Sequence, residues 1–348
     1  MLLQQLYAAV QTQRNNRSYH GAFRSQGSRV TAALSSTHLA FVFPGQGSQS
    51  LGMLGELAAL HPLVRETFDE ASQGAGIDLW ALSQHGPEEQ LNRTEFTQPA
   101  LLAASVAVWR LWRARGGAIP AQLAGHSLGE SSAMVAAGAM SLLDAARLVR
   151  LRGQLMQAAA PAGIGAMAAV LGAQDAMVLE ICAAVSGAEV VVPANFNSPG
   201  QIVIGGHAGA VDRALALLAE RGVRKVVKLA VSVPAHTPVM REAANRLAEA
   251  MTAMPWQVPT LPVVQNVDAE VHEGIESIRD ALVRQLYLPV QWTGCVQALA
   301  ARGATRIAEC GPGKVLTGLT KRIDKSIQAR SLCMPVDFEA TLDEWNNA

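Results

Sequence analysis

Three residues that lie far apart in the sequence could together perform nucleophilic catalysis. The first is Ser127, which stands between two glycines in Gly125-His126-Ser127-Leu128-Gly129, where a short apolar run gives way to a helix-like run. This pattern is typical of a nucleophile elbow, a tight turn that lifts a serine hydroxyl out of a sheet and faces it with the first N–H groups of a helix. We therefore predict that Ser127 is a nucleophile, although the five-residue pattern also occurs by chance.

The second residue is a histidine that could act as the base. His236 ends the run from Val231 to His236, just before a helix that we expect from Pro238. Pro234 restricts the backbone and thereby the direction of the imidazole. Histidine suits general-base chemistry because its ordinary pKa lies near neutrality. A histidine in front of a helix can also be a cap or a surface residue, and the pattern leaves these alternatives open.

The third residue is an arginine at the buried edge of a predicted helix. Ser141 is a favourable N-cap, and the helix is expected to continue to about residue 160. Arg152 lies beside its apolar stripe, whereas Arg147 and Arg150 point away from it. An unpaired buried charge costs several kcal/mol, so Arg152 requires an anion, either a ligand or an internal Asp or Glu. The stripe consists of Leu142, Ala145, Val149, Gly153 and Met156.

The order of the surrounding elements predicts an α/β fold with a mainly parallel sheet. Residues 39–43 form a continuous apolar strand, as in sheets that are buried on both faces, and a glycine-rich turn with Gln46 follows it. Helices are expected at residues 51–60, 63–74 and 87–91, and Thr97-Gln98-Pro99 then opens a helix that runs to about residue 115. The elbow strand comes next.

Residues 163–231 change to shorter units and predict a ferredoxin-like subdomain inserted into the larger body. We expect strands at residues 165–172, 189–194, 201–205 and 223–231, with helices at 174–186 and 208–221. The resulting order is β-α-β-β-α-β. In this interpretation residues 195–200 form the loop between the two middle strands.

The chain then returns to the large body. A strand is expected at residues 261–266, helices at 277–286 and 291–302, and a strand at 305–309. The following Gly-Pro-Gly-Lys lacks the earlier glycine and the later Ser or Thr of a nucleotide-binding loop, so we interpret it as a turn into a helix at Val315. Residues after about 327 show no clear pattern and are expected to form a loose tail.

Composition excludes several functional classes. The chain has 348 residues, of which 50% are hydrophobic and 16% charged, and 28 Lys and Arg balance 28 Asp and Glu. No broad basic surface for nucleic acid or membranes is therefore expected. The four cysteines lie far apart and signal neither a zinc site nor a disulfide framework. This cysteine pattern makes the reducing cytoplasm the simplest compartment. No run approaches ~18 apolar residues, so we expect no membrane span.

The first 37 residues contain arginine but no Asp or Glu. We interpret residues 1–37 as a disordered extension or an upstream start, with a targeting peptide as the alternative. The expected division is then a large catalytic domain of residues 38–162 and 232–330, the small subdomain of residues 163–231, and a tail of residues 331–348.

Several motifs occur in an order that resembles one family, over roughly Leu39 to Lys325. Together they resemble the malonyl-CoA:acyl carrier protein transacylases of bacterial type II fatty acid synthesis. The resemblance implies an α/β-hydrolase-like large domain, an inserted ferredoxin-like small domain and an active site in the cleft between them. The motifs are Phe43 to Gln49, Thr97 to Ala100, Gly125 to Glu130, Arg152-Gly153 with Met156, Asn195 to Gly200, Val233 to His236, Gln285 to Tyr287 and Gly311 to Leu316.

The resemblance also implies the catalytic roles. Ser127 would attack the thioester of malonyl-CoA, and His236 would take its proton and later activate the phosphopantetheine thiol of acyl carrier protein. Backbone N–H groups of Gln46 and Leu128 would form the oxyanion hole. Arg152 would bind the malonyl carboxylate, which supplies the anion that the helix pattern requires.

The remaining implied site residues surround the acyl group. Gln98, His126, Met156 and Asn197 would contact the substrate, and the backbone carbonyl of Gln285 would orient His236. The resemblance implies no cofactor or metal, malonyl-CoA and acyl carrier protein as the partners, and a monomer.

Other functions share part of this pattern. An esterase or thioesterase would use the same Ser127 elbow, but it needs no arginine in its acyl pocket and usually supplies an acid partner for the histidine. A closer alternative is a transferase of the same fold that serves a polyketide pathway or malonate decarboxylation. The sequence distinguishes it poorly from a transferase of fatty acid synthesis. A non-catalytic scaffold would not need Ser127, His236 and Arg152 together.

Overall fold

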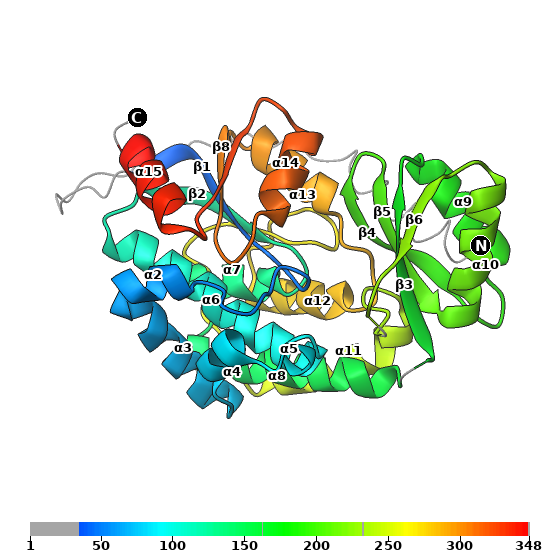
Figure 1. The fold of residues 1–348 in the computed structure, drawn as a ribbon, viewed down its shortest axis with the longest axis horizontal. Helices are drawn as coiled ribbons and strands as arrows, with labels where there is room; N and C mark the ends of the chain where they lie inside the picture. Colours follow the sequence, from blue (N-terminus) through cyan, green and yellow to red (C-terminus); the bar gives the residue numbers. More distant parts are fainter. Residues whose placement is uncertain (1–34, 162, 232, 347–348) are drawn as a thin grey trace.

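The molecule consists of a larger body built on a parallel sheet and a smaller part built on an antiparallel sheet (Figure 1). The computed structural model describes residues 35–161, 163–231 and 233–346. The parallel sheet has the order β7-β2-β1-β8-β9. This arrangement confirms the predicted fold class. The strands of the body are β1 (Ser35–Phe43), β2 (Ile119–Gly125), β7 (Val263–Val264), β8 (Arg306–Glu309) and β9 (Gln328–Ser331).

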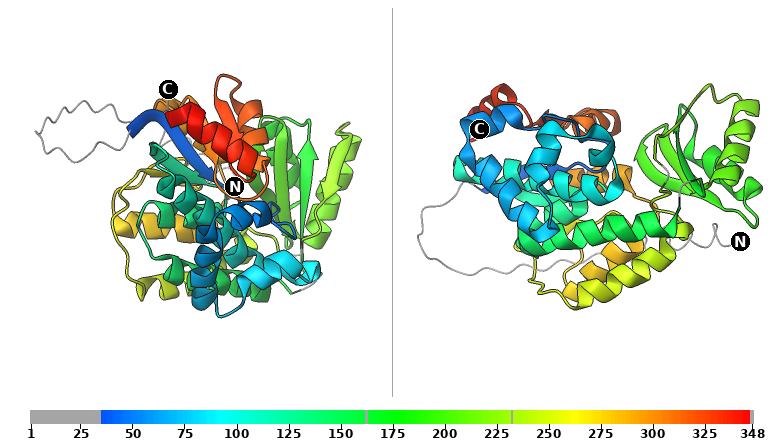
Figure 2. Two further views of the ribbon diagram at one scale, coloured as in Figure 1. Left: turned by 60° about the vertical axis from the view of Figure 1, so that its left-hand side comes forward. Right: turned by 60° about the horizontal axis from the view of Figure 1, so that its bottom comes forward.

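Helices cover both faces of the parallel sheet (Figure 2). The alternation along β1 directs Leu39, Phe41 and Phe43 into the larger core, while Ala40 and Val42 face a second core under α13 and α14. The helices are α2 (Gly55–Leu60), α3 (Pro62–Ala75), α4 (Leu79–His85), α5 (Glu88–Leu91), α6 (Thr94–Ala114), α7 (Gly129–Ala136), α8 (Leu142–Ala159), α11 (Arg241–Thr252), α12 (Ile275–Gln285), α13 (Trp292–Ala301), α14 (Val315–Ile323) and α15 (Pro335–Asn346), with a 3-10 turn η2 (Pro238–Met240).

The smaller part has the ferredoxin-like order that the sequence predicts. Its sheet order is β4-β5-β3-β6, and each neighbouring pair is antiparallel. Helices α9 (Asp175–Val185) and α10 (Ala208–Glu220) pack on one face. Met167 and Val203 belong to a separate apolar cluster and line the cavity described below. The strands are β3 (Gly165–Leu171), β4 (Val191–Ser198), β5 (Gln201–His207) and β6 (Lys225–Lys228).

One predicted loop in this part is wrong. Strand β4 continues through Asn195 and Asn197 to Ser198, and the chain turns only at Pro199 and Gly200. Phe196 donates its N–H to the carbonyl of Val290 at 2.9 Å, so the segment pairs with the large body as well as with β5. This backbone pairing stabilises an extended conformation that the polar side chains do not indicate.

Helix α6 begins earlier than predicted. Its first residue is Thr94, and Pro99 lies inside the helix instead of opening it. The N–H groups of Phe96 and Thr97 both bond to the carbonyl of Arg93, which establishes the first turn before the proline. Gln98 therefore projects from within a buried helix.

The two ends of the described chain also differ from the predictions. Residues 1–34 lie outside the described residues, and β1 already begins at Ser35, through backbone pairing with β2 that needs no apolar side chain. The expected loose tail is wrong, because β9 extends the sheet and α15 packs on the body. In α15, Phe338, Leu342 and Trp345 form a buried stripe at helical spacing.

The turn between β2 and α7 has the tight form that a nucleophile elbow requires. A Cβ on Gly125 would lie 1.9 Å from the backbone carbon of Gly129, and a Cβ on Gly129 would lie 2.0 Å from the carbonyl oxygen of Phe43. Ser127 at the tip has a φ of 53°, in the left-handed region that non-glycine residues rarely adopt. Backbone contact thus explains both glycines of the predicted motif.

Helix α14 begins over a buried carboxylate. Glu309 accepts hydrogen bonds from the N–H groups of Leu316 and Thr317 at 3.0 and 2.7 Å. The protein's own carboxylate thus occupies the N-terminus of this helix, which agrees with the interpretation of Gly-Pro-Gly-Lys as a turn.

None of the helices in the described parts of the chain combines the length and the apolar character needed to cross a bilayer.

Candidate active site

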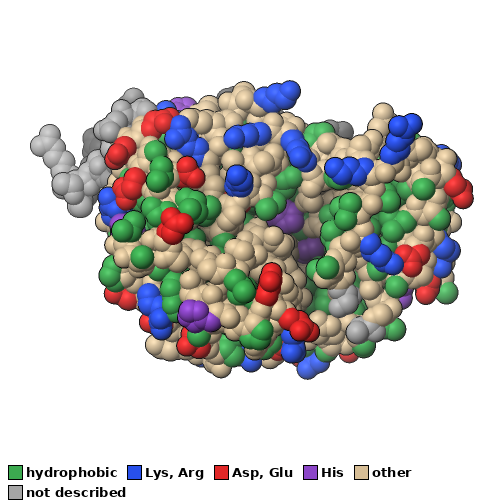
Figure 3. All heavy atoms as spheres, viewed as in Figure 1, with side chains coloured by type: hydrophobic (Ala, Val, Ile, Leu, Met, Phe, Trp, Pro, Cys, Tyr) green, Lys and Arg blue, Asp and Glu red, His purple; other side chains and the backbone are tan. Residues whose placement is uncertain are grey.

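A cavity of about 340 Å³ lies between the two parts of the molecule. In the space-filling view, histidine atoms are visible in the hollow between the body and the smaller part (Figure 3). Both parts contribute to the wall, as predicted for a cleft between domains. The body supplies Gln46, His126, Ser127, Leu128, Arg152, Met156 and His236, and the smaller part supplies Met167, Asn195, Asn197, Val203 and Leu229.

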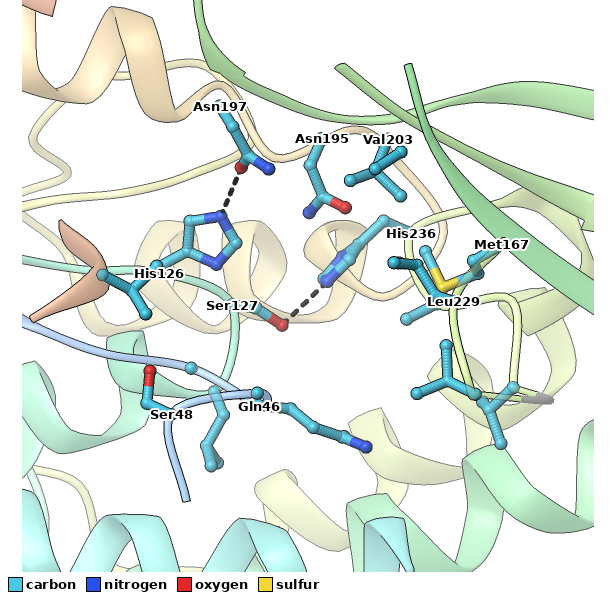
Figure 4. Close-up of a pocket in the computed structure, with 18 of the residues that line it drawn as sticks. Gln46, Ser48, His126, Ser127, Met167, Asn195, Asn197, Val203, Leu229 and His236 are labelled. Carbon is cyan, nitrogen blue, oxygen red and sulfur yellow. Dashed lines mark hydrogen bonds between the residues drawn. The ribbon is translucent and has the colours of Figure 1, made fainter. Parts of the chain in front are cut away.

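Ser127 and His236 meet at the floor of this cavity (Figure 4). The serine Oγ lies 2.7 Å from His236 Nε2. His236 Nδ1 lies 2.6 Å from the carbonyl oxygen of Gln285, which is the contact that the family resemblance implies. Because a carbonyl only accepts hydrogen bonds, Nδ1 carries the proton and Nε2 presents its lone pair to the serine hydroxyl.

His236 is held in its neutral form. Burial, and after it the nearby charge of Arg152, lower the pKa of His236 to about 3, and only the Gln285 carbonyl contact acts in the opposite direction. His236 is 3% exposed and adopts a φ of 64°. At neutral pH the imidazole can therefore accept a proton from Ser127.

Two residues of the cavity wall have backbone amides without an acceptor among the described residues. The N–H groups of Gln46 and Leu128 donate no hydrogen bond to any other described residue, and both residues line the cavity wall. Leu128 is the N-cap of α7, where the helix dipole favours negative charge. These amides could stabilise an oxyanion that develops beside Ser127.

Arg152 brings a buried positive charge to the nucleophile. Its Nη1 donates to the side-chain oxygen of Gln98 at 2.8 Å, and its Nη2 donates to the side-chain oxygen of Gln285 at 3.0 Å and to Ser127 Oγ at 3.5 Å. No carboxylate of the described chain forms an ion pair with it. Burial lowers the pKa of Arg152 to about 10, so the guanidinium remains charged at neutral pH.

The other predicted contact residues lie around this group. Gln98 is fully buried behind Arg152, and its side-chain N–H reaches Met156 Sδ at 3.5 Å. The resemblance implies that Gln98 contacts the substrate, yet Gln98 does not line the cavity, because its side-chain oxygen faces the guanidinium. His126 Nε2 bonds to Asn197 Oδ1 at 2.8 Å across the two parts, and burial lowers the pKa of His126. The hydrogen bond of His126 thus links the two parts of the molecule.

The sequence motifs missed one residue that holds the elbow. Asn266 accepts a hydrogen bond from the backbone N–H of Ser127 at 2.7 Å and donates to the carbonyl of Gly125 at 2.6 Å. It follows β7 at the carboxyl edge of the parallel sheet. In open α/β sheets, polar residues at this edge are candidates for site residues. The position of Asn266 at the end of a predicted strand could therefore have identified it from the sequence.

The same region contains a buried acid. Glu130 lies in the first turn of α7 and is fully buried. Burial raises the pKa of Glu130 to about 7, although hydrogen bonds from Gln265, Asn266 and Gln285 oppose this shift. Where the chain is described, no three His, Cys, Asp or Glu side chains cluster in a way that could hold a metal ion.

The chain matches one protein family over most of its length. A model of the acyl transferase domain matches residues 40–339. A malonyl CoA-acyl carrier protein transacylase from Salmonella typhimurium is 53% identical over 308 residues, which cover 88% of this chain and 100% of that protein. A protein of the same name from Bacillus subtilis is 41% identical over 313 residues, covering 89% of this chain and 98% of that protein.

Solved structures are similar as well. A malonyl-CoA:acyl carrier protein transacylase from Xanthomonas oryzae pv. oryzae has a TM-score of 0.89 and 74% identity, and the match covers 90% of this chain and 99% of that chain. A type II polyketide acyl-carrier protein in complex with its malonyl-transacylase matches with a TM-score of 0.87 and 49% identity, over 88% of this chain and 99% of that chain.

The electrostatics of His236 predict an unusual pH profile for Ser127. Phenylmethylsulfonyl fluoride, which carries no carboxylate, should label Ser127 at a rate that falls less than about threefold between pH 8 and pH 5, because the base stays unprotonated. Intact mass against time measures this rate, and Ser127→Ala is the control that should not be labelled. A fall centred near pH 6.5, the ordinary pKa of histidine, would contradict the burial effect.

Proposed function

The chain belongs to the malonyl-CoA:acyl carrier protein transacylase family, and from this premise we infer that it transfers malonyl groups from malonyl-CoA to the phosphopantetheine thiol of acyl carrier protein. This acyltransferase activity supplies extender units for fatty acid synthesis. The observation that carries the inference for this chain is the buried guanidinium of Arg152, which faces the nucleophile and has only neutral side chains as partners.

The proposed reaction begins with acylation of Ser127. His236 Nε2 removes the hydroxyl proton, and Oγ attacks the thioester carbonyl carbon. The carbonyl oxygen gains negative charge, which the N–H groups of Gln46 and Leu128 stabilise. The C–S bond then breaks, CoA leaves with the proton from His236, and a malonyl ester remains on Ser127.

The second half reverses these steps with a different thiol. His236 takes the proton of the phosphopantetheine thiol, and the thiolate attacks the malonyl ester carbonyl. The same two amides stabilise the new oxyanion. Ser127 then leaves and recovers its proton from His236, so the enzyme returns to its starting state with no net change in protons.

Arg152 would select the acyl group in this mechanism. A guanidinium forms paired hydrogen bonds with a carboxylate, and those bonds are strong where water is excluded. Arg152 is 5% exposed and already lies within 3.5 Å of Ser127 Oγ, so a malonyl group on the serine could reach it. Acyl groups without a carboxylate would leave this charge without an anion. His126, Met156 and Asn197 line the same cavity and would bound the acyl group.

The same reasoning extends to the cofactor, the compartment and the oligomeric state. We propose that no cofactor takes part, because the side chains and amides named above supply every proton and charge that the two steps need. We also propose a monomer, because Ser127, His236, Arg152 and both oxyanion amides of the proposed mechanism belong to the same chain and the two steps need no residue from a second copy. Free cysteines, three of them buried, fit the reducing cytoplasm.

Mass spectrometry would test the proposed function directly. After mixing with malonyl-CoA, the peptide that contains Ser127 should carry one malonyl group, and Ser127→Ala should carry none. His236→Ala should slow acylation by about 10²–10⁴-fold, the range for loss of a positioned base. Addition of phosphopantetheinylated acyl carrier protein should move the malonyl group to the carrier.

The same experiment separates a transferase from a hydrolase. Without an acceptor the malonyl ester should persist for many turnover times, because the acyl carboxylate on Arg152 and the short elbow leave little place for an attacking water. Steady release of CoA in the absence of an acceptor, at a rate near that of transfer, would identify a hydrolase and refute the proposal.

Arg152→Ala should change the acyl selectivity. Malonyl transfer should lose roughly 2–5 kcal/mol of transition-state stabilisation, as for truncation of a buried charge pair, whereas acetyl transfer should lose much less. Acylation rates with malonyl-CoA and acetyl-CoA measure this difference. Arg147→Ala, on the exposed side of the same helix, is the matched control. An equal loss for both substrates would show that Arg152 is structural.

A further inference from the structure

A carboxylate without a role in the proposed reaction lies behind the nucleophile. Glu130 Oε1 accepts from the side-chain amide of Gln265 at 3.0 Å, and Oε2 accepts from the backbone N–H of Asn266 at 2.8 Å and from the side-chain amide of Gln285 at 2.9 Å. All three partners donate, and none could accept a carboxyl proton. The geometry therefore favours an ionised Glu130, a second buried charge beside Arg152, against the burial that raises the pKa of this carboxyl to about 7.

Gln285 stands between these two charges. Its side-chain oxygen accepts from Arg152 Nη2 at 3.0 Å, while its side-chain nitrogen donates to Glu130 Oε2 at 2.9 Å and to the carbonyl oxygen of Ser127 at 3.0 Å. The orientation of the amide is fixed, because a guanidinium only donates and a carboxylate only accepts. Gln285 is 2% exposed, so water does not replace these contacts.

We propose that the Gln285 side chain is a positioning residue for malonyl selectivity: its amide bridges Arg152 and Glu130, keeps them from pairing directly, and fixes the guanidinium relative to Ser127. This inference rests on the proposed function. It assigns the side chain a task separate from that of the Gln285 backbone carbonyl, which contacts His236.

The physical reason is competition for the guanidinium. A direct arginine–carboxylate pair uses two parallel N–H groups, the same fork that a malonyl carboxylate needs. The amide oxygens of Gln285 and Gln98 instead take single hydrogen bonds from Nη2 and Nη1. The negative charge of Glu130 still stabilises the buried cation at a distance, while several of the five N–H groups stay available for the substrate.

The hydrogen bond from Gln285 to the carbonyl of Ser127 fixes the distance between the guanidinium that would bind the carboxylate and the hydroxyl that attacks the thioester. One amide contacts both the nucleophile's own carbonyl and the guanidinium, so the two cannot move apart without breaking a buried hydrogen bond. In malonyl-CoA a single CH2 group separates the thioester carbon from the carboxylate carbon, so the distance between these two carbons is fixed. A rigid frame between Ser127 and Arg152 therefore favours malonyl over acyl groups of other lengths or charge.

Gln285→Met tests the proposal because it keeps the backbone carbonyl and the side-chain size but removes the amide. The kcat/KM for acylation of Ser127 by malonyl-CoA should fall about 10- to 100-fold, the range for lost hydrogen bonds to a charged group, and acetyl-CoA acylation should fall less than about threefold. The ratio of the two rates on one preparation does not depend on the fraction of folded protein. Gln285→Asn, whose amide is too short to bridge, should show the same change in ratio.

A double-mutant cycle tests whether Gln285 acts through Arg152. In an Arg152→Ala background, Gln285→Met should reduce malonyl acylation by less than about threefold further. The matched control is Gln122→Met, because Gln122 is also buried and bonds to a backbone carbonyl and to Arg302, but lies away from the cavity. It should leave both rates and their ratio unchanged.

Three results would overturn the proposal. Equal losses with malonyl-CoA and acetyl-CoA in Gln285→Met would show a merely structural role. Losses that multiply in the double variant would show that Gln285 acts independently of Arg152. A change in ratio in Gln122→Met would show that any buried amide has this effect. Failure of the unaltered protein to form malonyl-Ser127 would instead refute the proposed function.

Discussion

A buried arginine without a carboxylate in contact is the constraint on which the site depends. Helix α8 places Arg152 at 5% exposure, and its partners are the neutral amides of Gln98 and Gln285. Such a charge is unfavourable unless an anion completes its coordination or compensates for it nearby. Glu130 lies on the other side of the Gln285 amide, and its negative charge favours the charged form of Arg152. The guanidinium therefore stays charged and directed at the nucleophile.

The same charge affects the base as well as the substrate site. Arg152 contributes to the low pKa of His236, after burial, and so helps to keep the imidazole neutral. Gln285 connects the two effects, because its carbonyl fixes the ring and its side chain fixes the guanidinium. Recognition of an anionic acyl group and readiness for proton transfer are therefore properties of one network. This explains why the residues behind the cavity are buried polar groups and not apolar ones.

Local patterns in the sequence predicted the parts of the site that local physics determines. The glycines around Ser127 indicated the elbow, and the stripe of α8 separated Arg152 from the exposed Arg147. The same prediction was wrong for Arg150, which is half-buried because its guanidinium donates to the carbonyl of Ala75. The features that were not predicted depend on contacts between residues far apart in the sequence, which local patterns do not reveal. The extension of β4 depends on backbone bonds to residue 290, and the hold of Asn266 on the elbow joins residues more than a hundred positions apart. Helix α15 shows a readable stripe, but the acidic and polar residues between its three apolar positions obscured it.

The most direct test of this account is a crystal structure of the malonylated protein. If Arg152 exists to bind the acyl carboxylate, malonyl-Ser127 should place both carboxylate oxygens about 2.7–2.9 Å from guanidinium nitrogens, with Gln285 still between Arg152 and Glu130. A carboxylate that points into solvent while Arg152 keeps only its present partners would contradict the account, as would a direct contact between Arg152 and Glu130.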